Sequence, residues 1–221
     1  MKPNIAGNVE DLRSLVRNDT IARMSGSMIS NSLAMARGKL SSNDDYYTPP
    51  HMTESLLKRE KFNGLVYEVA SGDGSMSKVI EKFNDCISSD IKSECYGIPN
   101  IDFLKDDNRK QNIITNPPYR YATEFLEHSL KIVDERIAFL LPLNFLQSRR
   151  RYNLFINSPL QKVMVFCLRQ TIVPVNRIVR DNGVMVYAWF IWDKSYSGKS
   201  MIEWINDDKP KRSQTLRGSS P

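Results

Sequence analysis

The sequence predicts an α/β fold, in which helices cover both faces of a mostly parallel sheet. Short apolar runs rich in β-branched and aromatic residues alternate with stretches of helical spacing along the middle of the chain. The first of these runs ends in a glycine turn, 71–76, that leads directly into a helical stretch. The 221 residues can form one such domain with a small appendage, and a second full domain is not expected.

Composition divides the chain into three parts. Residues 1–45 predict a helical N-terminal extension, residues 46–206 form the main domain, and residues 207–221 predict a flexible basic tail. The apolar side of the extension is typical of core packing or of a dimer contact, and it includes Met24, Met28, Ile29, Leu33 and Met35.

Hydrophobic periodicity places the elements of the main domain. Strands are predicted at 64–70, 86–90, 112–115, 136–141, 161–168 and 184–192. Helices are predicted at 51–58, 77–83 and 122–133, the first beginning near Pro50. His128 lies off the apolar stripe of the last helix and is expected to be exposed. Trp189 and Trp192 are expected to be packing residues.

Charge and cysteine content limit the classes of function. The net charge is +6, and basic residues cluster at 149–151 and 209–212, which suits a polyanionic partner or a solvated surface. Cys86, Cys95 and Cys167 lack Cys-x-x-Cys spacing and are expected to be buried free thiols in a reducing compartment. The two histidines and the lack of a carboxylate–histidine cluster predict no metal site. Without a signal peptide or a long apolar span, a soluble cytoplasmic protein is expected.

One short motif carries the chemistry. The apolar run at 112–115 ends in Asn116, Pro117, Pro118 and Tyr119. The prolines donate no backbone hydrogen bonds and hold the chain extended, so their carbonyls stay available as acceptors. Asn116 adds a side-chain acceptor and Tyr119 a flat ring, and together they could hold a planar group by its exocyclic amine. A plain strand-ending turn would use the same four residues, so the rest of the chain must decide.

Asn-Pro-Pro-Tyr resembles the catalytic motif of amino-methyltransferases that use S-adenosylmethionine, chiefly the DNA adenine-N6 enzymes. A second element agrees in wording and position, because Tyr46-Tyr47-Thr48-Pro49 resembles the Tyr-Tyr-Thr-Pro element before the first strand of that family. The resemblance implies that Tyr47, Thr48 and Pro49 contact the methionine end of the cofactor.

The glycine turn supplies a third element. Its two glycines let the backbone approach a ligand closely, but it lacks the third glycine of a dinucleotide fingerprint and the Gly-Lys-Ser/Thr ending of a P-loop. It resembles the S-adenosylmethionine motif, in which the acid of the strand leans toward the methionine portion. The resemblance implies cofactor binding by Glu68, Ala70, Ser71, Gly72 and Gly74, with alanine at 70 where a glycine is often found.

Two further acids complete the predicted cofactor site. Asp90 ends the second strand roughly 20 residues after the glycine turn, a spacing at which an acid can accept both ribose hydroxyls. A turn or helix-capping aspartate is the alternative for that position. Asp102 and Phe103 resemble the next element of the family, in which the acid meets the adenine amine and the ring lines its face.

The joint order of these elements over residues 45–205 implies a Rossmann-like class I methyltransferase of the kind carried by bacteria and their viruses. Its sheet would have seven strands, with 112–115 as the fourth and an antiparallel last strand at 184–192. The implied reaction transfers a methyl group from S-adenosylmethionine to the N6 amine of adenine in DNA, by direct displacement on a flipped base. Alternatives are an RNA adenine-N6 or protein glutamine-N5 methyltransferase, or a catalytically idle nucleic-acid-binding relative.

Partners follow from the basic residues and from the N-terminal extension. Phosphates beside the site are predicted to contact Arg149, Arg150, Arg151, Arg177 and Arg180. The N-terminal helices are predicted to mediate a homodimer.

Overall fold

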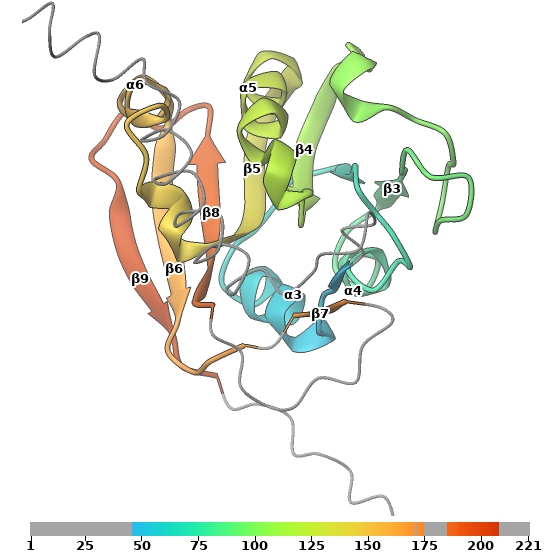
Figure 1. The fold of residues 1–221 in the computed structure, drawn as a ribbon, viewed down its shortest axis with the longest axis horizontal. Helices are drawn as coiled ribbons and strands as arrows, with labels where there is room; N and C mark the ends of the chain where they lie inside the picture. Colours follow the sequence, from blue (N-terminus) through green and yellow to red (C-terminus); the bar gives the residue numbers. More distant parts are fainter. Residues whose placement is uncertain (1–45, 171, 175–184, 208–221) are drawn as a thin grey trace, which may run out of the picture. The chain divides into compact units, whose positions relative to one another are not determined.

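The structure is a computed structural model that describes residues 46–170, 172–174 and 185–207 (Figure 1). The predicted N-terminal helices with their dimer contact, the predicted tail from 208 onward, and both Arg177 and Arg180 lie outside these residues.

A mixed seven-stranded sheet forms the centre of the described domain (Figure 1). Its strands are β2 (Val66–Glu68), β3 (Cys86–Ser88), β4 (Lys110–Thr115), β5 (Val133–Pro142), β6 (Leu160–Phe166), β8 (Tyr187–Asp193) and β9 (Met201–Ile205). The strand order is β3-β2-β4-β5-β8-β6-β9, and only β8 runs antiparallel to its neighbours β5 and β6. The predicted seven-stranded, mostly parallel sheet is confirmed.

Two strand assignments differ from the sequence prediction. The antiparallel strand β8 is not the last strand, because β9 follows it and pairs parallel with β6 at the edge of the sheet. Residues 89–109, all described, contain only an isolated bridge from Ser89 to Ile98 and the 3₁₀ turn η1 (Phe103–Lys105). Proline cannot continue a strand ladder, and Pro99 follows Ile98 directly. The strand at 112–115 is therefore the third strand of this sheet along the chain, not the fourth.

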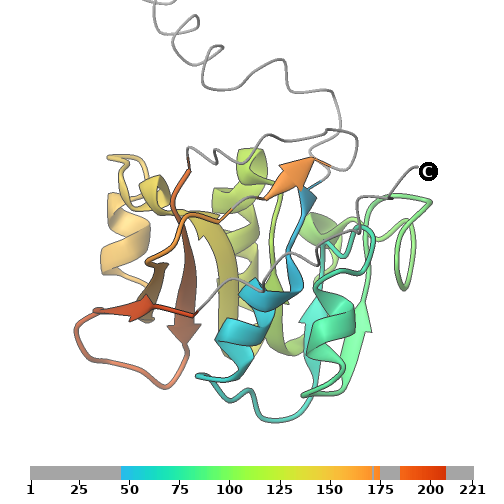
Figure 2. The same cartoon turned by 90° about the horizontal axis from the view of Figure 1, so that it is seen from below.

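Helices cover both faces of the sheet, as predicted (Figure 2). The helices α3 (Pro50–Leu57) and α4 (Ser77–Ile80) contribute to one buried apolar cluster. The helices α5 (Ala122–Ile132) and α6 (Tyr152–Ile156) pack against a second cluster on the opposite face. The helix α4 is shorter than the predicted 77–83, because the chain continues from Glu81 in turns.

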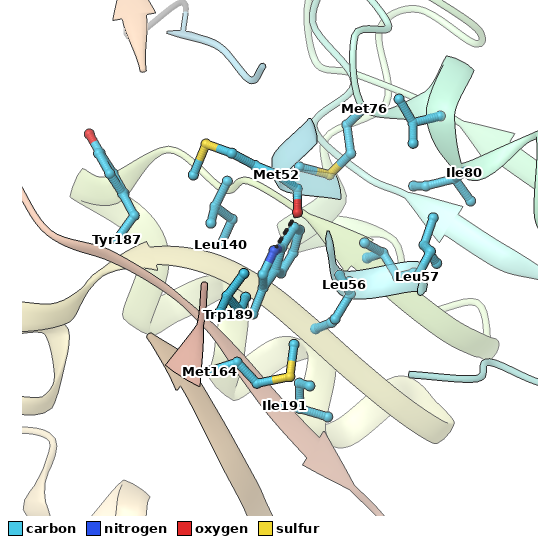
Figure 3. Packing of buried hydrophobic residues seen from close by; sticks show 14 of the residues in the cluster. Met52, Leu56, Leu57, Met76, Ile80, Leu140, Met164, Tyr187, Trp189 and Ile191 are labelled. Atoms are coloured by element: carbon cyan, nitrogen blue, oxygen red, sulfur yellow. Dashed lines mark hydrogen bonds between the residues drawn. The ribbon is translucent and has the colours of Figure 1, made fainter. Parts of the chain in front are cut away.

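The helix α3 is fixed to the sheet by a buried tryptophan. Trp189 on β8 is fully buried, and its indole Nε1 donates a hydrogen bond to the Met52 carbonyl at 2.9 Å (Figure 3). Trp192 is also fully buried and donates to Ser158 Oγ at 3.1 Å, so the packing role predicted for both tryptophans is confirmed. Burial of an apolar side chain of this size contributes about 1.5–3 kcal/mol. The first turn of α3 is therefore held firmly against the sheet.

Two burial predictions need correction. His128 is half-buried because its Nε2 pairs with the Asp106 carbonyl at 3.0 Å and its ring meets Phe103 edge-on. Of the three free thiols, Cys167 is exposed, while Cys86 and Cys95 are half-buried. Among the helices of the described residues, none is both long and apolar enough to cross a membrane.

Candidate active site

Three predicted site residues come together because they follow neighbouring parallel strands. Glu68 is the last residue of β2, Asp90 lies just beyond β3, and Asn116 directly follows β4. The carboxyl ends of parallel strands meet at one edge of a sheet, which is where α/β folds bind ligands. The three side chains therefore lie at the same edge of the sheet.

Asn116 presents a free acceptor. Its Nδ2 donates a hydrogen bond to Thr48 Oγ1 at 3.0 Å. Its Oδ1 is buried and accepts no hydrogen bond from any residue that the structure describes. A buried acceptor without a protein donor costs about 1–3 kcal/mol, so Asn116 Oδ1 is a candidate acceptor for an N–H group of a ligand.

The proline pair adds one further acceptor beside Asn116. Pro118 has φ −56° and ψ 118°, and its carbonyl accepts from the Tyr121 amide at 2.8 Å, where the 3₁₀ turn η2 (Tyr119–Tyr121) begins. The expectation that both proline carbonyls stay available is therefore wrong for Pro118. The Pro117 carbonyl accepts no hydrogen bond from the described part of the chain.

Tyr119 is half-buried beside the motif. Its ring packs on both apolar clusters, and its centroid lies 6.2 Å from that of Tyr187 with the planes tilted by 41°. The ring is thus held by the core next to Asn116, as a stacking role requires.

Glu68 is a buried acid that is only partly satisfied. The Thr115 hydroxyl donates to its Oε1, whereas Oε2 is buried without a hydrogen-bond partner among the described residues. Burial raises the pKa of Glu68 to about 8, and the nearby Asp90 charge contributes in the same direction. At neutral pH this carboxyl is therefore predominantly protonated.

The two glycines of the turn differ in their surroundings, because Gly72 faces open space and Gly74 lies against Tyr96. Gly72 has φ +51°, and a Cβ there would meet nothing within 4 Å, so the backbone is accessible to a ligand. Gly74 has φ +79°, and a Cβ there would lie 2.3 Å from the Tyr96 side chain. Tyr96 also donates its backbone N–H to the Gly72 carbonyl at 2.8 Å, and its own carbonyl accepts from Ser71 Oγ at 2.6 Å. Sequence reasoning missed Tyr96, because no motif marks its contact with the turn.

Asp90 connects the glycine turn to the end of β3. Its buried carboxylate accepts from the Gly72 amide at 2.9 Å through Oδ2 and from the Lys92 amide at 3.0 Å through Oδ1. A carboxylate has about four lone-pair positions, so these two bonds leave capacity for further donors such as ribose hydroxyls.

Asp102 and Phe103 lie at the turn η1. Asp102 Oδ1 accepts from the Leu104 amide at 3.2 Å, and the hydrogen bond from Lys105 lowers the pKa of Asp102. Phe103 is almost fully buried, with its ring 4.9 Å from that of Phe125. Phe103 therefore packs in the core, and its contact with an adenine ring stays a prediction.

The Tyr-Tyr-Thr-Pro element is anchored by a segment that follows β6. The strand β1 (Tyr46–Tyr47) pairs antiparallel with β7 (Val173–Pro174). One turn further on, His51 Nε2 pairs with the buried Gln170 Oε1 at 2.7 Å. Thr48 is buried, Pro49 half-buried and Tyr47 exposed, so the three predicted cofactor contacts differ widely in accessibility.

The three described arginines differ in exposure and in their contacts, and their binding of phosphates stays a prediction. Arg149 is exposed, and Arg150 lies 3.6 Å from the Glu124 carboxylate. Arg151 Nε instead donates to the Phe145 carbonyl at 2.8 Å, and its guanidinium lies 4.3 Å from the Phe145 ring centroid. Burial lowers the pKa of Arg151. Arg151 is thus engaged within the protein, which leaves Arg149 and Arg150 as the exposed pair. In the described ranges, no group of three or more His, Cys, Asp or Glu residues could hold a metal ion.

Comparison with known proteins bears on the fold. No protein-family model matches the sequence, and no curated protein matches it significantly. A candidate RNA methyltransferase from Pyrococcus horikoshii has a similar structure, with a TM-score of 0.53 and 16% identity over 74% of this chain and 97% of that chain. For magnesium protoporphyrin IX methyltransferase from Synechocystis, solved with bound SAH, the TM-score is 0.47 and the identity is 12%, over 66% of this chain and 83% of that chain. For the M protein of the type I restriction enzyme EcoKI, the TM-score is 0.49 and the identity is 14%, over 69% of this chain and 45% of that chain. The Rossmann-like fold predicted from the sequence is confirmed by the first of these likenesses.

Proposed function

We propose that this protein transfers a methyl group from S-adenosylmethionine to the exocyclic N6 amine of adenine in DNA. The observation that carries the proposal is the Asn116 side chain, whose Oδ1 is buried without a donor among the described residues while its Nδ2 is held by Thr48. A buried acceptor next in the chain to the Pro117 carbonyl, which accepts no hydrogen bond from the described residues, suits a ligand that brings two N–H groups on one nitrogen.

The chemistry of an aryl amine explains why two acceptors are needed. The amine lone pair is delocalised into the ring, which makes the nitrogen a poor nucleophile. If Asn116 Oδ1 and the Pro117 carbonyl each accept one N–H, the nitrogen is drawn toward tetrahedral geometry and its lone pair becomes available for a direct displacement. When bound, the cofactor would supply the methyl group on its sulfonium, whose S–CH₃ bond breaks to leave a neutral thioether as the N–CH₃ bond forms, and the methylated nitrogen would then release one of its protons. No covalent intermediate is required.

The residues around the glycine turn fit this cofactor. Gly72 offers accessible backbone, Asp90 retains acceptor capacity for ribose hydroxyls, and Glu68 holds a buried Oε2 without a partner among the described residues. Ionised Glu68 would attract the positive charge of the methionine portion. These three groups lie at the same edge of the sheet as Asn116.

A base that reaches Asn116 must leave the duplex, and Tyr119 supplies the ring on which it can stack. The net charge of +6 and the exposed Arg149 and Arg150 favour a polyanion. RNA is the second candidate substrate, because the structural neighbour from Pyrococcus horikoshii is described as an RNA methyltransferase.

The proposal is tested with methyl-labelled S-adenosylmethionine and three substrates in parallel: unmethylated DNA, RNA of the same sequence and a protein release factor. After digestion, mass identification of the products is expected to find labelled N6-methyladenine from DNA. Label found only in RNA or only on glutamine would replace the substrate, and cofactor binding without any labelled product would reject catalysis.

A further inference from the structure

Thr48 makes a contact that the proposed reaction does not use directly. It lies 68 positions before Asn116, it is 4% exposed, and its Oγ1 accepts the hydrogen bond from Asn116 Nδ2 at 3.0 Å. The contact joins the Tyr-Tyr-Thr-Pro element to the Asn-Pro-Pro-Tyr motif.

A primary amide can serve as an acceptor only if its oxygen faces the ligand. Asparagine side chains rotate about two bonds, and a rotated Asn116 would offer N–H donors to a substrate amine that needs an acceptor. A hydroxyl that accepts from Nδ2 keeps the amide plane fixed and leaves Oδ1 directed away from it. In the structure this Oδ1 is the buried atom without a partner among the described residues.

We propose that Thr48 is a positioning residue that holds the Asn116 carboxamide with Oδ1 ready to accept the substrate amine. The inference rests on the proposed function, since it assigns Thr48 an effect on the methyl-transfer step through Asn116. It differs from a cofactor contact, because the partner of its hydroxyl is a side chain of the protein itself.

Thr48 is itself rigidly held, as a positioning residue must be. On its N-terminal side, Tyr47 pairs with Val173 in the β1–β7 ladder. On its C-terminal side, the Pro49 carbonyl accepts from the Met52 amide at 3.0 Å, and Met52 is fully buried in the first apolar cluster. The backbone of Thr48 is therefore held on both sides, so its hydroxyl meets Asn116 from a fixed segment of the chain.

The test compares Thr48→Val, which removes the hydroxyl at nearly constant shape, with Thr48→Ser, which keeps it. In single-turnover assays on DNA, Thr48→Val is expected to lower the methyl-transfer rate by about 10- to 100-fold with little change in cofactor Kd. Thr48→Ser is expected to retain the rate within about threefold. The matched control is Thr53→Val, because Thr53 Oγ1 is buried on α3 without a partner among the described residues, and its rate is expected to stay unchanged.

A double-mutant cycle separates positioning from an independent role. If Thr48 acts only through Asn116, the variant Thr48→Val/Asn116→Ala is expected to be no slower than Asn116→Ala alone. Multiplying losses in the double variant, or a loss in Thr48→Val that lies in cofactor Kd instead of the rate, would overturn the proposal.

A structural readout keeps this inference distinct from the proposed function. The Asn116 side-chain N–H resonances, assigned by their disappearance in Asn116→Ala, are expected to shift or broaden in Thr48→Val and to persist in Thr48→Ser. Lack of any methylated product from wild-type protein would reject the proposed function even if these resonances behave as expected. Unchanged resonances together with an unchanged rate in Thr48→Val would reject the positioning role alone.

Discussion

Polar side chains at the two edges of the sheet are satisfied in different ways. Toward the amino ends of the parallel strands, Arg136, Glu60 and Lys162 form ion pairs at 2.7 and 2.9 Å, although each side chain is at most 14% exposed. At the carboxyl edge, Asn116 Oδ1 and Glu68 Oε2 are buried without a partner among the described residues. The first edge pairs its charged groups within the protein, whereas the second leaves two buried acceptors without a donor among the described residues.

The amino-edge network joins several segments of the chain, although Arg136 Nε has no hydrogen-bond partner among the described residues. Arg136 also donates to the Lys61 carbonyl and to Gln161, and it pairs with Asp193. Lys162 additionally contacts Glu203 on β9 at 2.8 Å. These bonds connect the chain after α3 with four strands of the sheet, so loss of Arg136 leaves the buried Glu60 carboxylate with one cation instead of two.

The largest expected effect is the loss of Arg136. Arg136→Ala leaves Glu60 buried beside a single cation, and we expect the free energy of unfolding to fall by about 3–5 kcal/mol in urea denaturation. The matched control is Arg109→Ala, because Arg109 pairs with Asp134 at an exposed site, where about 0–1 kcal/mol is expected. Equal losses in the two variants would remove the distinction between a buried and an exposed ion pair.

The converse change at the carboxyl edge is Asn116→Ala. We expect methyl transfer to slow by about 10²–10³-fold, because an acceptor for the developing charge is lost. Cofactor binding should persist, and the free energy of unfolding should fall by only about 0.5–1.5 kcal/mol, because the Nδ2 hydrogen bond to Thr48 is lost whereas Oδ1 had no donor among the described residues. Single-turnover assays and denaturation check both halves. Full turnover in this variant would remove Asn116 from the catalytic role.

The raised pKa of Glu68 makes stability depend on pH. The folded protein holds its proton up to a pKa of about 8, whereas the ordinary value is 4.5, so the folded state binds more protons in that interval. The free energy of unfolding should therefore fall as pH rises from about 4.5 to about 8. Glu68→Gln should flatten the curve in denaturation series, while the exposed control Glu94→Gln should not.

The proton on Glu68 also allows a test of whether this residue binds the positively charged portion of the cofactor. If S-adenosylmethionine binds best to ionised Glu68, its affinity should rise as pH approaches 8, with release of one proton at neutral pH. Calorimetry in two buffers of different ionisation enthalpy measures that proton. Absence of proton release in wild type, or equal release in Glu68→Gln, would place the cofactor's positive charge elsewhere.

Sequence patterns could predict the groups that follow the strands. Chain direction alone brings Glu68, Asp90 and Asn116 to one edge once the strands are known to be parallel. The contacts that complete the site join distant segments through tertiary packing, and no local pattern encodes them. Thr48 with Asn116 and Tyr96 with Gly74 are both of this kind.

The fold was predictable where apolar runs are long. The strand β8 is almost entirely buried, whereas Ile202 and Trp204 on β9 are exposed, so β9 lacks the buried alternation that marks a strand. Only its pairing with β6 defines it. Arg151 illustrates the same limit for charges, since a basic run does not reveal that one member is bound to the Phe145 carbonyl.

The smallest expected effect concerns the partly exposed ion pair of Asp207 with Arg59. It tests whether pairing without burial can account for the stability of the network at the amino edge. Asp207 accepts from Ser55 Oγ and from two nitrogens of Arg59, and the Arg59 hydrogen bond lowers the pKa of Asp207 to about 2. A lowered acid pKa stabilises above the ordinary value of 3.8, and this stability is lost as pH falls toward 2. Because the side chain is 36% exposed, solvent screening limits the effect to about 0.2–1 kcal/mol. Asp207→Asn, measured by denaturation at pH 6 and at about pH 2.5, should show this loss only at the higher pH. A loss as large as that of Arg136→Ala would mean that the geometry of pairing, and not burial, determines how much such a network contributes.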